Sequence, residues 1–329
     1  MSHFDIVIIG AGPIGLTCGI ESKRRNLSHL IIEKGCLVNS LFHYPTNMTF
    51  FSTSERLEIG EIPFVSHGDK PTRRETLEYY RRAADAWKLN IHTYEEVLTI
   101  RKDGDKFFTV TNKAEYTANN IIIATGFFDM PNLLKIPGED KFKVKHYFDE
   151  AHPYAYLKLV IIGGGNSAVD VALETFRRGS EVTMVIREER LKESVQYWVR
   201  PDIENRIKEG SIKAYFSSEV TDIRNNEVDI KTPNGKITLE NDFVFAMTGY
   251  HPDYEFLEKA GVNISNSESQ IPEYDEETFE TNIKGLYLAG VVRGGGWKPA
   301  NGLSKIQDPT QLAYLITLKK QKFTLLNLT

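Results

Sequence analysis

Three glycines at positions 10, 12 and 15 follow a short apolar run at 4–9 with the spacing G-x-G-x-x-G. In a dinucleotide-binding turn the first glycine permits the tight bend, the second lets the backbone approach the pyrophosphate, and the third lets helix and strand pack closely. The N-terminus of the following helix then faces the negative phosphates. These residues, with Pro13 where the turn passes into the helix, therefore predict dinucleotide chemistry.

The residues after this turn supply the strand–helix–strand context that confirms such a motif. A helical pattern covers 16–25, and a second apolar run at 30–32 ends on Glu33, with Lys34 next to it. A carboxylate at the end of this strand can accept the ribose hydroxyls of an adenosine. The first 35 residues therefore predict a complete nucleotide-binding unit.

The same plan returns in the middle of the chain. An apolar strand at 157–162 leads into the turn Gly-Gly-Gly-Asn-Ser-Ala at 163–168, with alanine in the last place. A helix at 169–178 stops at Gly179, and a strand follows at 182–186. Internal similarity of this kind indicates two related nucleotide-binding domains.

The charge that follows the second copy indicates which nucleotide it binds. Arg187 stands where the first copy has its ribose-binding carboxylate, and an arginine there suits a 2′-phosphate. Arg190 and Lys192 can assist, whereas Glu188 and Glu189 act in the opposite direction. We therefore expect NADPH to be favoured over NADH.

The two copies predict an α/β protein with two nested Rossmann-like domains, the fold of FAD/NAD(P)-binding flavoproteins. We expect residues 1–126 plus 250–329 to bind FAD, because a strand at 285–290 has the form that completes a flavin site, and residues 127–249 to bind NAD(P)H. The predicted FAD ligands are Gly10, Gly12, Pro13, Gly15, Glu33, Lys34, Ala124, Thr125, Gly126 and Gly290, and the predicted NADPH ligands are Gly163, Gly165, Asn166, Ser167, Ala168 and Arg187.

Composition excludes several other classes of protein. The net charge of −5 over 329 residues gives no electrostatic footprint for nucleic acid. No apolar run reaches the ~20 residues of a membrane span, and the N-terminus lacks a signal peptide. We expect a cytoplasmic protein with no metal, acting on a small-molecule disulfide or another electron acceptor; a homo-oligomer is compatible with the sequence.

Longer segments resemble a known family. The pieces GAGPIG, ATG, GGGNSA and YLAG resemble thioredoxin-reductase-like flavoproteins. The segments YPTNMTFFSTSERLEIGEIPF at 44–64, HYFDEAHPY at 146–154 and FAMTGYHPDYEFL at 245–257 resemble the bacillithiol-disulfide reductase family. This resemblance implies an FAD enzyme that uses NADPH to reduce the disulfide of a low-molecular-weight thiol.

The cysteines depart from these families. The stretch before the second glycine motif has no C-x-x-C, so the dithiol relay of thioredoxin reductases is excluded. Members of the bacillithiol family carry a cysteine directly after the proline of the first motif, and here that place is Ile14. Cys18 is a weak catalytic candidate, because it is expected to face the core, and Cys36 lies away from the expected flavin ring.

The last segment, 297–329, is atypical of the family. The family continues with a W-F-I-E-N-S-R-x-H-A helix over the flavin, which the chain does not contain. With suitable codons, reading the gene two nucleotides later from Trp297 restores E-T-G-K-W-F-I-E-N-S. We therefore expect a shifted reading frame that begins near 294–297; a genuine divergent tail, with a helix from Asp308-Pro309, is the alternative.

Three functions remain open on the sequence alone. The first is an NADPH-dependent reductase of a small disulfide. The second is a flavin-containing monooxygenase, because Ala124-Thr125-Gly126-x4-Pro131 fits one of its motifs, although its F-x-G-x3-H fingerprint is not found. The third is a flavoprotein without turnover, which the altered tail favours.

Overall fold

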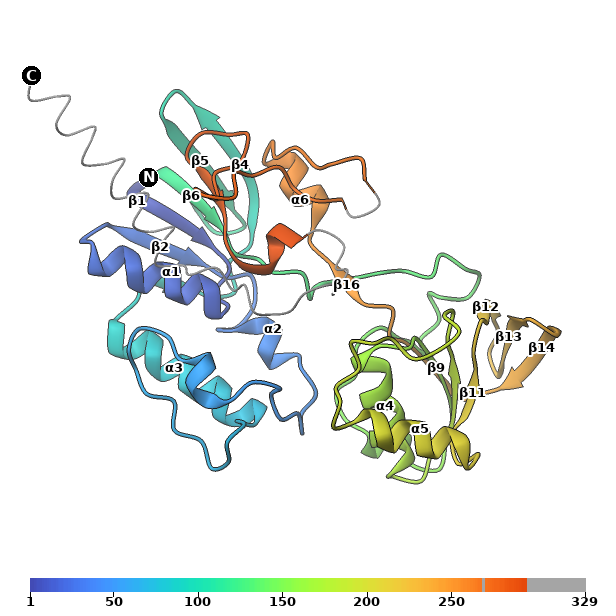
Figure 1. Ribbon diagram of the computed structural model, residues 1–329. Coiled ribbons are helices and arrows are strands. Elements are labelled where there is room, and N and C mark those ends of the chain that lie inside the picture. Colours follow the sequence, from blue (N-terminus) through green and yellow to red (C-terminus); the bar gives the residue numbers. More distant parts are fainter. Residues whose placement is uncertain (268–269, 295–329) are drawn as a thin grey trace, which may run out of the picture. The chain divides into compact units, whose positions relative to one another are not determined.

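The computed structural model describes residues 1–267 and 270–294. The chain divides into two compact units, Met1–Met130 with Tyr250–Thr329, and Pro131–Gly249 (Figure 1). No helix of the described part is long and apolar enough to cross a membrane. Each unit is an α/β layer structure, so the predicted fold class is confirmed.

The first unit is built on a seven-stranded sheet in the order β3-β2-β1-β6-β5-β4, with β17 paired to β6. β1, β2, β3, β6 and β17 are parallel, whereas β4 and β5 form an antiparallel hairpin on one side. The strands are β1 Ser2–Ile9, β2 His29–Ile32, β3 Ile91–His92, β4 Val97–Asp103, β5 Lys106–Thr111, β6 Glu115–Ile123 and β17 Leu286–Leu288.

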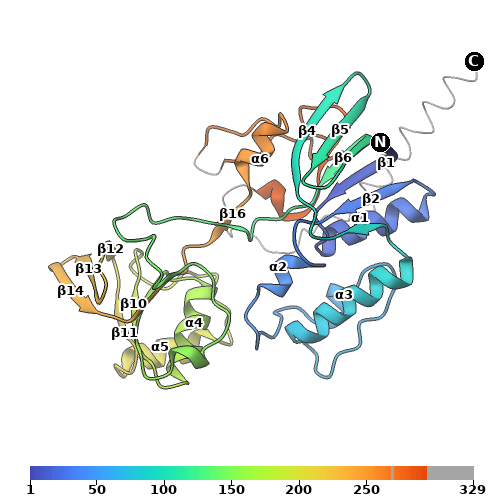
Figure 2. The same cartoon turned by 180° about the vertical axis from the view of Figure 1, so that it is seen from behind.

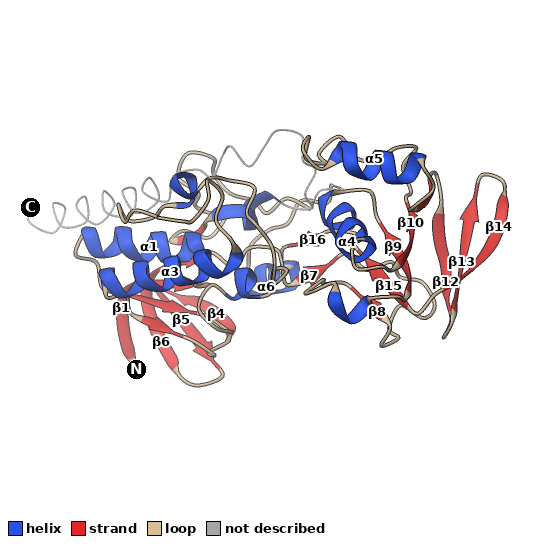
Figure 3. Cartoon of the chain, turned by 90° about the horizontal axis from the view of Figure 1, so that it is seen from below, coloured by secondary structure: helices blue, strands red, loops and turns tan. Residues whose placement is uncertain are grey.

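Helices α1 and α3 lie side by side on one face of this sheet (Figure 3). Residues at the end of β1 are buried on both faces, which explains why Ile6–Ile9 is a continuous apolar run. Thr72 and Glu75 form a capping box at the start of α3. The helical elements of this unit are α1 Pro13–Arg24, α2 Asn39–Phe42, η1 Ser54–Leu57, α3 Arg73–Trp87, α6 Tyr254–Lys259 and η3 Gly290–Gly294.

The second unit repeats the parallel core with a five-stranded sheet in the order β11-β10-β9-β15-β8. Apolar residues of α4 and α5 cover one face, and the antiparallel sheet β12-β13-β14 covers the other (Figure 2). Its elements are β8 Val144–Lys145, η2 His152–Tyr154, β9 Lys158–Ile162, α4 Asn166–Phe176, β10 Glu181–Val185, α5 Arg200–Lys208, β11 Lys213–Tyr215, β12 Glu219–Ile223, β13 Glu227–Thr232, β14 Gly235–Glu240 and β15 Phe243–Ala246.

Two short strands, β7 Met130–Pro131 and β16 Tyr250–His251, connect the units and pair with each other. An aromatic cluster holds both connections at the first unit. The ring centroid of Phe128 lies 4.9 Å from that of Tyr44 and 4.8 Å from that of Tyr250. Aromatic pairs at these distances attract beyond the area they bury.

Candidate dinucleotide sites

The first glycine turn joins the carboxyl end of β1 to the start of α1. Gly10 has φ +103°, and a Cβ there would lie 2.6 Å from the carbonyl oxygen of Ala124, so the turn presses against the end of β6. A Cβ on Gly15 would lie 1.9 Å from the carbonyl oxygen of Gly10. Both positions therefore require glycine for packing within the protein.

Gly12 differs from its neighbours because no atom of the described residues outside its own chain neighbours lies within 4 Å of where its Cβ would be. Open space at the N-cap of α1 is what a pyrophosphate needs in order to approach the backbone. The N-cap residue of helix α1 is Gly12, which has no side chain to accept from the first N–H groups of the helix. The turn therefore fits a dinucleotide phosphate.

Glu33 lies directly after β2 and is buried beside the turn, with 7% of its surface exposed. The backbone N–H of Ala11 donates to its Oε2 at 2.8 Å, and that of Gly35 donates to its Oε1 at 3.0 Å. Burial raises the pKa of this carboxyl, and the two N–H donors act against that rise. The carboxylate is thus held rigidly at the place where an adenosine ribose is expected.

Other predicted residues of the first site gather at the same edge of the sheet. Lys34 forms an ion pair with Asp129 at 2.8 Å, which fixes the start of the connecting strand β7. Ala124 is buried at the end of β6, Thr125 follows it, and Gly126 has φ +72° with open space beside it. The carboxyl ends of parallel strands are where an open α/β sheet binds its ligands.

Gly290 begins η3, two residues after the end of β17, and lies against the side chain of Ile14. It has φ +80°, and a Cβ there would lie 3.0 Å from Cγ1 of Ile14. Position 14, near the start of α1, therefore contacts the strand that the sequence assigned to the flavin. Isoleucine there can pack but carries no thiol.

The second turn repeats this geometry in the other unit. Gly163 has φ +131°, and a Cβ there would lie 2.5 Å from the carbonyl oxygen of Met247 at the end of β15. Gly165 lies at the start of α4, and among the described residues the atom nearest to a Cβ placed there is Cδ of Lys192, at 3.7 Å. Ala168 is buried where the first turn has Gly15, and Ser167 is exposed. The second turn therefore has the same backbone geometry as the first.

The strand register corrects the position predicted for Arg187. The N–H of Gly10 donates to Ile32, and the N–H of Gly163 donates to Val185, so the residue equivalent to Glu33 is Ile186. Ile186 is fully buried, and Arg187 corresponds to Lys34. The prediction that Arg187 stands in the place of Glu33 is therefore wrong by one residue, because the second strand ends one residue earlier than its apolar run suggested.

Asn166 begins α4 and organises the loop that follows β10. Its Nδ2 donates to the carbonyl of Ser194 at 2.9 Å, and its Oδ1 accepts from the N–H of Gln196 at 3.0 Å. The N–H of Lys192 donates to Gly164 in the same loop. Both ends of the Asn166 amide are thus used to hold this loop against the turn.

Asp170 is a residue that the sequence analysis missed. It lies one turn into α4, and burial raises its pKa to about 6, with Glu174 as a further cause. A carboxyl with a strongly raised pKa beside a ligand-binding turn is a candidate functional group. An acid four residues after Asn166, between Val169 and Val171, was the signal available in the sequence.

The cysteines are unsuited to thiolate chemistry. Cys18 is 1% exposed, and burial followed by the charge of Glu21 raises the pKa of its thiol to about 12. The role of Cys18 as a weak catalytic candidate stays a prediction, and this environment argues against it, because a reactive thiol needs a lowered pKa and access. Cys36 is partly buried, its pKa is also raised, and its Sγ contacts Asn39 at 3.6 Å.

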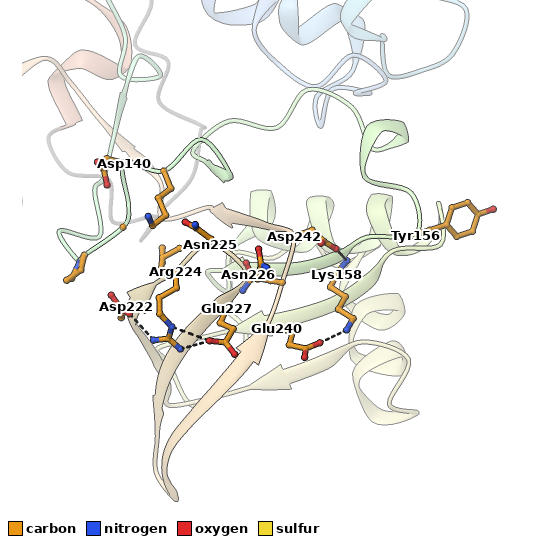
Figure 4. A pocket seen from close by; sticks show the side chains of 15 residues that line it. Asp140, Tyr156, Lys158, Asp222, Arg224, Asn225, Asn226, Glu227, Glu240 and Asp242 are labelled. Atoms are coloured by element: carbon orange, nitrogen blue, oxygen red, sulfur yellow. Dashed lines mark hydrogen bonds and ion pairs between the residues drawn. The ribbon is translucent and has the colours of Figure 1, made fainter.

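A wide cleft of about 1190 Å³ lies elsewhere in the second unit (Figure 4). Lys158 begins β9 and Asp242 directly precedes β15, so the cleft is at the amino edge of the sheet, opposite the glycine turn. Lys158 pairs with Glu240 at 2.6 Å, as the close view shows. Arg224 pairs in the same cleft with Asp222 and Glu227, so several of the charged side chains that line it are already paired.

The expected frame shift near 294–297 and the atypical segment 297–329 lie outside the residues described by the structure, apart from Gly294 itself. Within the described ranges no group of three or more His, Cys, Asp or Glu side chains could hold a metal ion. The two glycine turns are therefore the candidate functional sites of the described residues.

Comparison with known proteins agrees with this geometry. The family described as pyridine nucleotide-disulphide oxidoreductase matches residues 7–290. The bacilliredoxin reductase Bdr of Bacillus subtilis is 44% identical over 291 residues, which cover 88% of this chain and 90% of that protein.

Two solved structures named bacillithiol disulfide reductase Bdr (YpdA) are similar. The one from Bacillus cereus has a TM-score of 0.93 at 38% identity, covering 97% of this chain and 100% of its own. The one from Staphylococcus aureus has a TM-score of 0.92 at 41% identity, covering 97% of this chain and 98% of its own.

Proposed function

Because the chain belongs to the pyridine nucleotide-disulphide oxidoreductase family, we propose that it reduces a low-molecular-weight disulfide such as bacillithiol disulfide. FAD and NADPH are its cofactors, and the protein is an oxidoreductase. The observation that carries the proposal is the presence of two glycine turns with the same geometry, one in each unit. The solved relatives that share this fold bear the name of this activity.

We assign FAD to the first turn and NADPH to the second. Gly12 leaves room for a pyrophosphate, and Glu33 presents a fixed carboxylate to the adenosine ribose. The second turn has Ile186 at the position of Glu33, and the cations Arg187 and Lys192 in the adjoining loop suit a 2′-phosphate. When bound, the two cofactors supply the hydride chemistry.

The net reaction takes two electrons and two protons to cleave one disulfide. NADPH and one proton react with a disulfide RSSR, giving NADP⁺ and two thiols RSH. Ile14 lacks a thiol, and the raised pKa values of Cys18 and Cys36 leave little thiolate at neutral pH. We therefore propose that no cysteine of this chain relays the electrons, and that the acceptor disulfide is reduced without a protein dithiol.

An anaerobic titration tests this function. We expect NADPH to bleach the flavin absorbance band and oxidised bacillithiol to restore it, with two thiols formed for each NADPH consumed. Cystine, glutathione disulfide and a bacilliredoxin carrying a mixed disulfide are the comparison acceptors. Bleaching without reoxidation by any disulfide would contradict the proposal, and faster reoxidation by bacilliredoxin would make a protein the acceptor, as the name of the Bacillus subtilis relative indicates.

The proposed function implies a cellular compartment, and it leaves one alternative to be tested. A reductase fed by NADPH and serving a thiol pool works in a reducing compartment, and we propose the cytoplasm. The alternative of a flavoprotein without turnover rests on 297–329, so it is tested by comparing FAD retention between the present chain and one with the reading frame restored from Trp297. Equal FAD retention and equal turnover would remove that alternative.

A further inference from the structure

Two cations in the loop after β10 converge on one carboxylate. Nη2 of Arg187 and Nζ of Lys192 each lie 3.7 Å from Oε1 of Glu188. Both separations exceed the about 2.7–2.9 Å of a charge-assisted hydrogen bond. All three side chains reach solvent, with 36% of the Glu188 side chain exposed and more of each cation. The single negative charge of this carboxylate therefore offsets part of the positive charge of the two cations without fixing either side chain.

Glu188 also lies close to the glycine turn. A Cβ on Gly164 would be 3.9 Å from Oε2 of Glu188. Gly164 holds the position that Ala11 holds in the first unit, where the N–H of Ala11 donates to Glu33. Glu188 thus brings a carboxylate to the side of the second turn where Ile186 has none.

We propose that Glu188 sets the preference of this enzyme between NADPH and NADH, an inference that rests on the nucleotide assignment of the proposed function. Its carboxylate competes with the 2′-phosphate of NADPH for Arg187 and Lys192. Toward a nucleotide without that phosphate, the same carboxylate is an acceptor for a ribose hydroxyl, as acidic residues are in NAD-binding turns. Glu188 therefore weakens NADPH binding and supports NADH binding.

Equilibrium binding to the FAD-loaded enzyme tests this role. NADP⁺ and NAD⁺ are titrated by calorimetry into the parent protein, Glu188→Gln and the matched control Glu189→Gln, which removes the same charge one residue away. For Glu188→Gln we expect the Kd of NADP⁺ to fall by about three- to fivefold and that of NAD⁺ to rise by a similar factor, the range of an exposed ion pair. Glu189→Gln should leave the ratio of the two Kd values within about twofold of the parent.

A triple substitution shows whether Glu188 acts through the cations. With Arg187→Gln and Lys192→Gln already present, adding Glu188→Gln should no longer tighten NADP⁺. The proposal is overturned if the ratio of Kd values is unchanged in Glu188→Gln, if Glu189→Gln shifts it equally, or if both nucleotides weaken together. Nucleotide binding does not depend on turnover, so the two proposals can fail separately. If NADPH does not reduce the flavin of the parent enzyme, the proposed function is contradicted. The ratio of the two Kd values still decides the role of Glu188 in that case.

Discussion

Helices α1 and α4 use equivalent residues in equivalent ways. Ser22 donates to the carbonyl of Cys18 at 2.8 Å, and Thr175 donates to that of Val171 at 2.7 Å. Around these hydroxyls, Arg24 pairs with Glu21 at 2.9 Å, just as Arg177 pairs with Glu174 at 3.1 Å. Each pair of equivalent residues is separated by the 153 positions that separate Gly10 from Gly163.

The two units diverge where the nucleotides are expected. Glu33 is buried and held by two backbone donors, so its carboxylate is in place before any ligand binds. In the second unit Ile186 is buried, and the charges lie on an exposed loop. A rigid buried acceptor suits a cofactor that stays bound, whereas loosely held surface charges suit a nucleotide that enters and leaves at each turnover.

The third glycine position gives the largest expected contrast. Gly15→Ala would force a methyl group to within 1.9 Å of a backbone oxygen, so we expect a loss of at least about 3 kcal/mol in the free energy of unfolding. Ala168→Gly, at the equivalent place, removes only a buried methyl and should cost about 1–2 kcal/mol. Equilibrium urea unfolding measures the stability of both variants. Equal losses would show that the two turns tolerate a methyl group at this position equally well.

The second glycine position separates the cofactors. The Cβ of Gly12→Val would meet no atom in the part of the chain that the structure describes, so the variant should fold. It should keep less than about a tenth of the parent flavin, because its side chain occupies the pyrophosphate position. Gly165→Val should keep the flavin and lose NADPH binding. The flavin-to-protein absorbance ratio and a nucleotide titration report each effect. A fully yellow Gly12→Val protein would contradict the assignment of FAD to the first turn.

Arg187 and Lys34 are equivalent positions with different expected roles. Arg187→Ala should weaken NADPH by about 1.5–3 kcal/mol and leave NADH nearly unchanged, because a charge-assisted contact to the 2′-phosphate is lost. Lys34→Ala removes a half-exposed ion pair with Asp129 and should cost less than about 1 kcal/mol of stability. Equal weakening of both nucleotides would give Arg187 a structural role only.

Asp170 predicts a pH dependence of stability in the second unit. The folded protein raises its pKa to about 6, above the ordinary value of about 3.9, so ionisation destabilises the fold as the pH rises from about 4 to about 6. Asp170→Asn cannot ionise and should be more stable than the parent by about 1–2 kcal/mol above pH 7, with the gain vanishing near pH 4. Thermal unfolding across this range checks it, and the exposed Asp105→Asn is the control. A gain that does not depend on pH would rule out the raised pKa as its cause.

The smallest effect on catalysis is expected at Cys18. Val171 occupies the equivalent position in the second unit, which indicates a packing role for the thiol. Cys18→Ala should cost about 1 kcal/mol of stability and leave disulfide reduction within about twofold of the parent. Iodoacetamide should not label Cys18 in the folded protein at pH 7 to 9, since its pKa is about 12. Loss of turnover in this variant would instead support a mechanism in which the Cys18 thiol takes part.

The sequence by itself determined the two dinucleotide turns and the strand–helix–strand units around them. This was possible because glycine spacing and apolar runs act over a few residues, and local sterics decide both. It also contained the register of Arg187: counting 153 positions from Glu33 leads to Ile186, and only the length of the apolar run suggested otherwise.

Tertiary structure alone decided the rest. Ile14 meets Gly290, Asn166 holds Ser194 and Gln196, and Glu188 lies beside Gly164. Each of these contacts joins residues far apart in the chain, so it depends on how strands pair and where loops return. The sequence already placed Cys18 toward the core, but the size of the rise in its thiol pKa depends on how completely helix α1 buries it against the sheet. Long-range packing sets the environment of a side chain, and no local pattern carries that information.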